Sequence, residues 1–366
     1  MKKTQVALAA LALVASSAAL ATEVKLSGQI DIGVFSTGKD TNGENGGVFM
    51  EQGGLMDHSS ITLSATEDLG NGLKAIAVLE SGFNANGGVD NGGTQGNTNA
   101  LFNRQSYVGL SSDSLGTVGL GKQLSPFILS QALTNFGVGS FWVNRLWVGD
   151  DGLGGSLSAG GNGLNYGGFF IPNAVTYTSP SIAGFTVRAM MATKNGTQGN
   201  GITANDPTGP AAFGIGTDNR LTSFSVDGNI AGAFVSAAYQ NRKDTYKSWT
   251  VGAVYPVMEG LSIMANYMHN KSEDSVAVKS WAVGGKYTIV AGTDVVLQYA
   301  QNNGDNDTAL KKRLTNLTLT HALSKRTTLY GTVAQGKQIG SSLGNWANDY
   351  EGKNNTSYGV GVAHSF

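Results

Sequence analysis

The sequence predicts an all-β fold, a transmembrane antiparallel β-barrel of sixteen strands. Three observations lead to this fold class. Segments with alternating side chains recur along the chain, the connections between them alternate between short and long, and no window beyond residue 21 is apolar enough to form a spanning helix. Because an open sheet edge would leave unpaired N–H and C=O groups in lipid, a membrane sheet has to close on itself.

The first residues have the pattern of a secretory signal peptide. A charged start at residues 2–3 precedes an apolar run at 6–14 and a small-residue cleavage site ending at Ala21. A transmembrane helix is the alternative, but the apolar stretch is short for one and no charged stop-transfer cluster follows. We therefore expect residues 1–21 to be a signal peptide and residues 22–366 to form one barrel domain.

Sixteen segments have the period-two alternation of a strand. They are 24–35, 58–67, 72–83, 102–111, 115–123, 173–179, 184–194, 219–227, 231–241, 246–255, 260–270, 278–289, 293–302, 312–322, 326–337 and 356–366. An even number brings both ends of a bacterial barrel to the same side of the membrane.

The connections fall into two classes. Short turns, such as 69–72 and 256–260, alternate with longer loops. The longer loops are 36–57, 84–101, 124–172, 195–218, 303–311 and 338–355, and two shorter ones are 242–245 and 271–277. Short turns on one rim and long loops on the other are typical of outer-membrane barrels, whereas a β-propeller would show a repeated blade motif.

The two faces of the expected strands differ in chemistry. The closing strand places its larger side chains on one face: Tyr358, Val360, Val362, His364 and Phe366. The other face of the late strands is small, polar or charged. Lipid outside and water inside explain this contrast better than the core of a soluble sandwich.

The composition excludes several classes of protein. The chain has 53 Gly and no Cys, so it is not a disulfide scaffold. It has 24 basic and 25 acidic residues, without the basic patch that nucleic acid requires.

Several segments spread over the chain carry a resemblance to a known family. They are 24–33 (VKLSGQIDIG), 66–75 (TEDLGNGLKA), 79–83 (LESGF), 102–110 (FNRQSYVGL), 116–123 (GTVGLGKQ), 175–180 (VTYTSP) and 360–366 (VGVAHSF). Together they resemble the general diffusion porins of Gram-negative bacteria, in particular the β-proteobacterial type. The resemblance implies a trimeric sixteen-stranded barrel in the outer membrane.

The resemblance also implies a constriction. In this family the third loop, here 124–172, folds into the lumen, and acidic residues on it face basic residues on the wall. The candidates on the loop are Arg145, Asp150 and Asp151, and the wall candidate is Arg104. Basic wall residues of similar porins correspond here to Ser60, Ser64 and Thr178. We therefore expect weak ion selectivity.

Successive side chains of a strand point to opposite faces, so the position of a residue in an expected strand, its parity, predicts whether it faces the lumen. Lys74 and Glu80 alternate with apolar residues in 72–83, and Arg188 and Lys286 do the same in their own strands. Charges inside a barrel contact water and set the field that solutes cross, although a position at the rim is the alternative. Parity points Lys122 outward unless a β-bulge intervenes.

No catalytic, metal or cofactor site is expected. The four histidines fall near strand ends: His58, His269, His321 and His364. Neither a nucleophile elbow nor zinc-type spacing is present. Asp305 and Asp307 lack the full calcium-loop pattern. We therefore expect a protein that is not an enzyme.

The expected function is a water-filled channel for passive diffusion of small hydrophilic solutes and ions. A substrate-specific channel for a sugar or small anion is one alternative, supported by Trp142 and Trp147 in the long loop. A structural barrel or adhesin without transport is another. The expected partners are outer-membrane lipid and lipopolysaccharide, the permeating solutes, and two further copies of the chain. The outward residues of the first strand suit contact with those copies because they are small or aliphatic: Val24, Leu26, Gly28, Ile30 and Ile32.

Overall fold

The computed structural model describes most of the predicted barrel. The described residues are 23–36, 47–51, 56–84, 101–136, 170–193, 220–243, 246–272, 277–304, 311–339 and 354–366. Residues 1–21, the expected signal peptide, lie outside them. Within the described part of the chain, no helix is long and apolar enough to cross a membrane.

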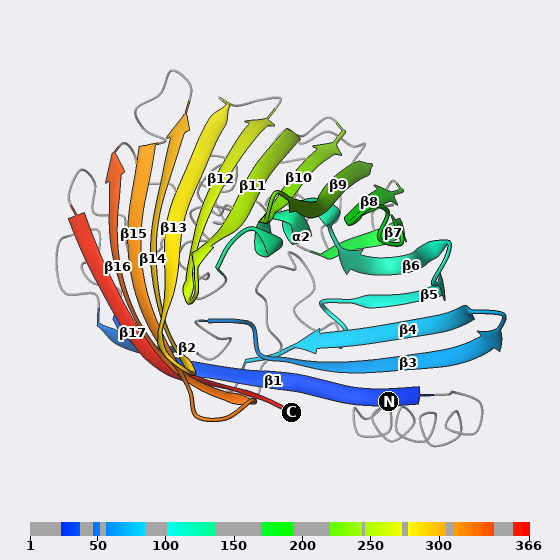
Figure 1. Cartoon of the computed structure of the whole chain (residues 1–366), viewed down its shortest axis with the longest axis horizontal. Helices are drawn as coiled ribbons and strands as arrows, with labels where there is room; N and C mark the ends of the chain where they lie inside the picture. Colours follow the sequence, from blue (N-terminus) through cyan, green and yellow to red (C-terminus); the bar gives the residue numbers. More distant parts are fainter. Residues whose placement is uncertain are drawn as a thin grey trace, which may run out of the picture.

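Sixteen strands form one closed antiparallel sheet (Figure 1). They are β1 (Glu23–Ser36), β3 (Ser60–Gly70), β4 (Leu73–Gly82), β5 (Ser106–Ser112), β6 (Gly116–Leu124), β7 (Phe170–Thr178), β8 (Phe185–Ala192), β9 (Leu221–Ile230), β10 (Ala233–Arg242), β11 (Tyr246–Met258), β12 (Leu261–Ser272), β13 (Val278–Val290), β14 (Thr293–Gly304), β15 (Lys311–Ala322), β16 (Thr327–Ile339) and β17 (Asn354–Ser365). Neighbours in the ring are neighbours in sequence, and β1 pairs with both β3 and β17. The predicted fold class is therefore confirmed.

The structure contains one additional strand that the alternation of side chains does not predict. Strand β2 (Val48–Glu51) pairs with Gly33–Ser36, the part of β1 that lies beyond its pairing with β3. These residues fall within the expected loop 36–57, because four residues are too few to display a clear alternation.

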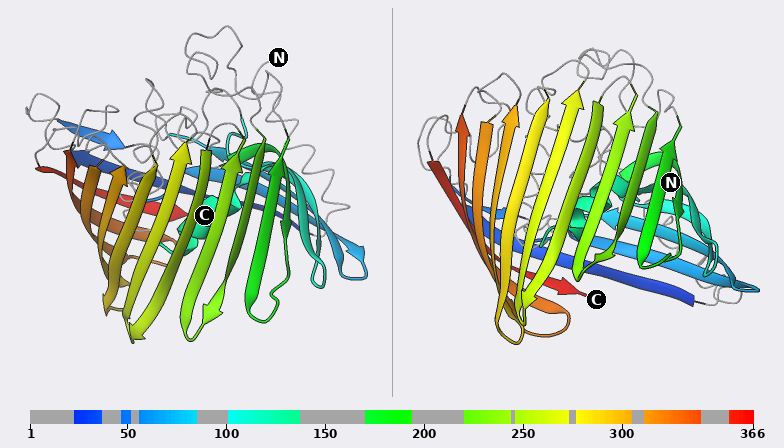
Figure 2. Two further views of the ribbon diagram at one scale, coloured as in Figure 1. Left: turned by 90° about the horizontal axis from the view of Figure 1, so that it is seen from above. Right: turned by 45° about the horizontal axis from the view of Figure 1, so that its top comes forward.

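The short turns lie on one rim of the barrel (Figure 2). The turn between β3 and β4 has positive φ at Asn71 (52°) and Gly72 (74°), and Ala231 and Gly232 repeat this between β9 and β10. Two successive positive φ values match the twist of a two-residue hairpin. Because strands alternate in direction, the start of β1 and the end of β17 fall on this same rim.

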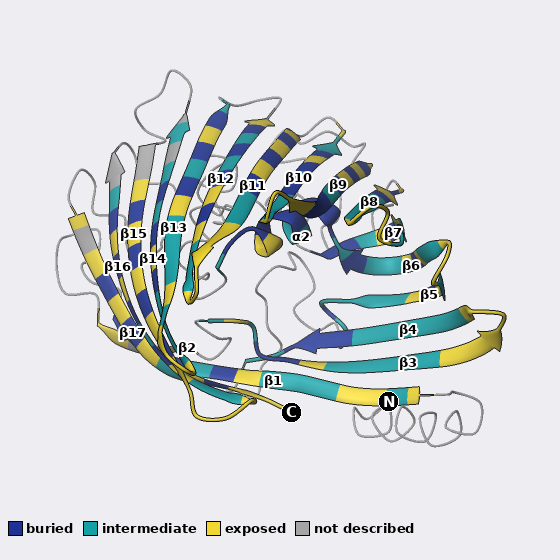
Figure 3. Ribbon diagram, in the orientation of Figure 1, coloured by how far each residue is buried: buried dark blue, intermediate teal, exposed yellow. Residues whose placement is uncertain are grey.

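The two faces of the sheet are exposed to different extents (Figure 3). In β14, Leu297 is 52% exposed while its neighbour Gln298 is 1% exposed. The same alternation of exposed apolar and buried polar residues runs through β9 to β17. A large apolar face that none of the described residues covers suits lipid, which confirms the outward and inward assignment of the strand faces.

The chain end closes the ring as predicted. Ile30 of β1 pairs with His364 of β17. Beyond the strand, the Phe366 amide donates to the Gly28 carbonyl at 2.9 Å, and the Gly28 amide donates back at 3.2 Å. The Phe366 ring also lies where a side chain on Gly28 would be.

A buried carboxylate ties this closure together on the inner side. Asp31 of β1 is fully buried, and its Oδ1 accepts a 2.5 Å hydrogen bond from the Tyr330 hydroxyl of β16. Its Oδ2 accepts the Met56 and Asp57 amides, each at 2.7 Å. The Tyr330 ring crosses β17 where a Cβ on Gly361 would be, so glycine is required there. The carboxylate thus joins β1, β16 and the residues that precede β3.

Tyr330→Phe is expected to destabilise the barrel by about 1–3 kcal/mol, because it removes a donor from a buried carboxylate. Urea unfolding in detergent measures the change. Tyr177→Phe is the matched control, since that hydroxyl donates to the Leu115 carbonyl from an exposed position. Equal stability of the two variants would contradict a structural role for the Tyr330 hydroxyl.

Candidate pore site on the lumen wall

The beginning of the long loop is a short helix inside the ring of strands (Figure 1). Helix α2 (Pro126–Leu133) starts after Ser125, whose hydroxyl accepts the Phe127 amide, and Pro126 occupies the first turn, where no amide donor is needed. The Phe127 amide also donates to the Ser223 hydroxyl of β9 at 3.1 Å. The hydroxyls of Ser130 and Ser236 on β10 lie 2.6 Å apart.

The residues after α2 continue along the inner wall. The Asn266 amide of β12 donates to the Thr134 carbonyl at 2.9 Å, and the Gln298 amide of β14 donates to Asn135 Oδ1 at 2.5 Å. Apolar side chains pack alongside, with Phe127 in one cluster with Met268 of the wall. Residues 125–135 therefore follow the inner wall from β9 to β14.

The rest of the loop contains three predicted site residues. Arg145, Asp150 and Asp151 lie outside the described residues, as do Trp142 and Trp147. Folding of the whole loop 124–172 into the lumen stays a prediction.

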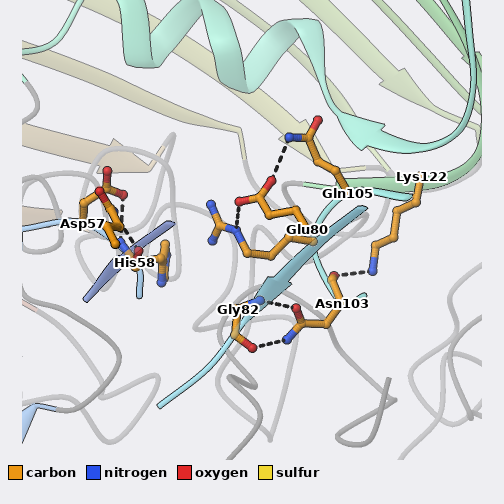
Figure 4. A network of polar contacts seen from close by, with 9 residues as sticks. Asp57, His58, Glu80, Gly82, Asn103, Gln105 and Lys122 are labelled. Atoms are coloured by element: carbon orange, nitrogen blue, oxygen red, sulfur yellow. Dashed lines mark hydrogen bonds and ion pairs between the residues drawn. The ribbon is translucent and has the colours of Figure 1, made fainter. Parts of the chain in front are cut away.

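The described wall brings Arg104 into contact with Glu80, which is labelled in Figure 4 beside Gln105. Arg104 Nε lies 2.6 Å from Glu80 Oε1, and Gln105 Nε2 donates to Glu80 Oε2 at 2.7 Å. The guanidinium also lies over the Phe170 ring of β7, 4.7 Å from its centroid. An aromatic face attracts a cation, so the carboxylate and the ring together hold Arg104 in place.

A local irregularity produces this contact. The Glu80 amide donates to the Gln105 carbonyl, and the Arg104 amide donates to the Glu80 carbonyl. Arg104 and Gln105 therefore both stand opposite Glu80, as in a β-bulge. The neighbouring residue Asn103 uses its side chain in place of a backbone pairing. Its Oδ1 accepts the backbone amide of Gly82, and its Nδ2 donates to the Gly82 carbonyl. Strand β5 consequently starts at Ser106, and the expected start at residue 102 is wrong.

The other wall candidates are separate from this cluster. Arg188 forms an ion pair with Asp227 of β9, which the sequence analysis did not single out. Lys74 pairs with Asp68 in register beside the turn at 71–72, and Lys286 pairs with Ser262. The sequence contains a signal for Asp227, because it lies two and four residues after Ser225 and Ser223 in β9 and therefore shares their inward face.

Lys122 is adjacent to a β-bulge, but it keeps the outward face. Strand β6 shifts register between Gly121 and Gln123, whereas across β5 the pairing is continuous and Lys122 stands opposite Ser106. Opposed residues share a face, and the next outward pair, Val108 and Leu120, is exposed. The ammonium donates to the Asn103 carbonyl at 2.6 Å (Figure 4).

The described histidines make local contacts. His321 Nδ1 lies 2.8 Å from the Thr293 hydroxyl, and His364 Nδ1 lies 2.9 Å from the Thr327 hydroxyl. His269 stacks on Trp249 on the outer face. In the described ranges no group of three or more His, Asp or Glu residues is arranged to hold a metal ion.

Comparison with known proteins gives a consistent result. The family described as Gram-negative porin matches residues 7–341. An outer membrane porin protein of Bordetella pertussis is 35% identical over 199 residues, covering 50% of this chain and 46% of the relative. Outer membrane porin protein 32 of Delftia acidovorans is 36% identical over 193 residues, covering 50% and 48%. The alignments thus span about half the length of these relatives.

One solved structure is similar over nearly the whole barrel. It is described as an anion-selective porin from Comamonas acidovorans, with a TM-score of 0.69 and 24% identity, covering 94% of this chain and 99% of that one. At this identity the similarity concerns the fold.

Proposed function

Because the chain belongs to the Gram-negative porin family, we propose that it forms a water-filled channel in the outer membrane for passive diffusion of small hydrophilic solutes and ions. The contrast between the two faces of the closed sheet is the main support. Exposed aliphatic and aromatic side chains cover the outside, while polar and charged side chains lie on the inside. Family and fold point to a channel protein rather than an enzyme.

Weak rather than strong ion selectivity fits the described wall. Arg104 is a cation on the inner side, but its charge is opposed by Glu80 at 2.6 Å, and Arg188 is opposed by Asp227. A strong preference for anions would require several basic groups without such partners, whereas Lys286, opposite Ser262, is one lumen candidate without a carboxylate opposite it. A small-anion channel is the second candidate, because the structurally similar porin is described as anion-selective and because Arg104 is a cation.

Conductance and liposome swelling test the proposal together. We expect stepwise conductance in planar bilayers, and swelling rates that fall smoothly as neutral solutes become larger. Swelling with one solute class only would support a substrate-specific channel. Folded protein without conductance or swelling would contradict a transport function.

We also propose export through a signal peptide at residues 1–21 and assembly into a homotrimer. Leu26 and Ile30 of β1 are exposed on the outer face, and small aliphatic side chains suit contact between subunits. Light scattering in mild detergent is expected to give three times the mass of one chain, and heating to give one. A single-chain mass before heating would contradict the trimer.

A further inference from the structure

A row of polar side chains crosses the inner wall beside the contact of Arg104 with Glu80. Ser27 of β1 is opposite Thr62 of β3, and Thr62 is opposite Glu80 of β4. Directly opposed residues share a face, so both hydroxyls lie on the inner face with the carboxylate. Neighbouring strands are about 4.8 Å apart, so the row presents successive polar groups at that spacing.

The next row toward the short turns adds an aromatic side chain. Ser64 of β3 is opposite Val78 of β4, and Val78 is opposite Tyr107 of β5. Tyr107 is partly exposed on the inner face, whereas its neighbour Val108 is exposed on the outer face. Glu80 interacts electrostatically with Tyr107, which places the phenol beside the carboxylate. We define the polar patch as Thr62, Ser64, Glu80, Arg104 and Tyr107.

Several polar atoms of the polar patch are available to a ligand. Thr62, Ser64 and Tyr107 are partly exposed, and none of their hydroxyls bonds to another of the described residues. Arg104 uses its Nε to donate to Glu80, and within the described ranges no oxygen accepts a hydrogen bond from its two terminal nitrogens. The patch therefore offers both donors and acceptors to a solute in the lumen.

The charges of this part of the wall are balanced. Arg104 lies 2.6 Å from Glu80, and Lys25, which is opposite Ser64, shares its face of β1 with Glu23. Opposite charges close together nearly cancel at a distance, so a charged solute gains little net attraction here. A neutral solute with many hydroxyls, in contrast, can use both the donors and the acceptors of the polar patch.

We propose that the polar patch binds the ring of a neutral sugar as it passes through the channel. Ring hydroxyls bond to Arg104, Thr62 and Ser64, while Tyr107 and Val78 supply an apolar surface for the C–H groups of the ring. Hydrogen bonds to the charged groups of the patch are stronger than those between neutral groups. The inference rests on the proposed channel function and adds a solute class that the wall retains briefly, without excluding other solutes.

Single-channel current in planar bilayers tests the proposal, with glucose as the probe. A bound sugar obstructs the passage of ions, so we expect the conductance to fall and then to level off as the glucose concentration rises. Tetra(ethylene glycol) is the comparison, because it has a similar mass but hydroxyls only at its two ends. It is expected to lower the conductance in proportion to the viscosity of the solution, without saturation.

Variants of the polar patch test which groups hold the sugar. Tyr107→Leu and Thr62→Val are each expected to raise the half-saturating glucose concentration about fivefold, the effect of one lost ring contact or hydrogen bond. Tyr107→Phe keeps the ring and removes only the hydroxyl, so it measures the site even if Tyr107→Leu does not fold. Tyr239→Leu is the matched control, because Tyr239 is 43% exposed on the outer face, and it is expected to keep the wild-type value.

Glucuronate separates a sugar site from an anion site, because it has the same ring with a carboxylate. Saturation at a lower concentration of glucuronate than of glucose would mean that charge is recognised instead of the hydroxyls, and the proposal is overturned. It is also overturned if glucose acts like tetra(ethylene glycol), or if Thr62→Val and the Tyr107 variants keep the wild-type half-saturating concentration. A wild-type protein without conductance in salt alone would contradict the channel function itself, so each glucose effect is measured relative to the salt conductance of the same protein.

Discussion

Glu80→Gln and Arg104→Ser are expected to shift the reversal potential in opposite directions. Glu80→Gln leaves the guanidinium without its carboxylate, so anions are favoured. Arg104→Ser leaves the carboxylate with only the Gln105 amide, so cations are favoured. A unit charge about 7 Å from an ion contributes about 0.6 kcal/mol in water, which changes the permeability of each ion about threefold.

The measurement is the reversal potential across a salt gradient in planar bilayers. Salt at 0.1 M screens charges over about 10 Å, so the dilute side should stay well below that concentration. The double variant is expected to return toward the wild-type value, because both charges are removed. Arg326→Gln, on the rim of short turns, is the control for a change in charge outside the cluster. Shifts in the same direction for both single variants would contradict the pairing of Glu80 with Arg104 as the source of selectivity.

Gly252→Ala is expected to detach the end of the α2 segment from the wall and to increase conductance. A Cβ at this position of β11 would lie 2.5 Å from Thr134 Oγ1 and 2.8 Å from Thr134 Cβ, and would overlap the Asn266 side chain. Asn266 donates to the Thr134 carbonyl, so the same methyl group disturbs the hydrogen bond that fixes residues 134–135. Overpacking of this kind costs about 1–3 kcal/mol, which is comparable with the hydrogen bonds that hold the segment.

Single-channel conductance and thermal unfolding measure the two consequences. Gly285→Ala is the matched control, because a Cβ at Gly285 in β13 would have no heavy atom within 4 Å. We expect that control to match the wild type in both measurements. A Gly252→Ala channel with wild-type conductance and stability would mean that residues 134–135 do not depend on close approach to β11.

Much of the barrel could be predicted from the sequence because strand alternation is a local property. Successive side chains point to opposite faces, so the pattern in 356–366 gives both the strand and its apolar face. The same rule predicts that Arg188 and Lys286 lie on the inner face. It missed β2, whose four residues are too short to display a period, and it placed the start of β5 four residues early.

The contacts of the candidate site could not be derived from alternation. Parity continued back from Val108 places Arg104 on the outer face, and only the local irregularity opposite Glu80 turns it toward that carboxylate. Likewise, the attachment of α2 depends on which wall residues its hydroxyls and amides meet across the lumen.

The sequence by itself determined the strands, their two faces, the rim of short turns and the pairing of the last strand with the first, since each follows from period, loop length and the need to close a sheet in lipid. Only the tertiary structure decided that Glu80 pairs with Arg104, that Lys122 stays outward beside a bulge, and that Thr62 stands opposite Glu80. These contacts join residues on different strands. Their register depends on bulges and pairing offsets that no single segment encodes.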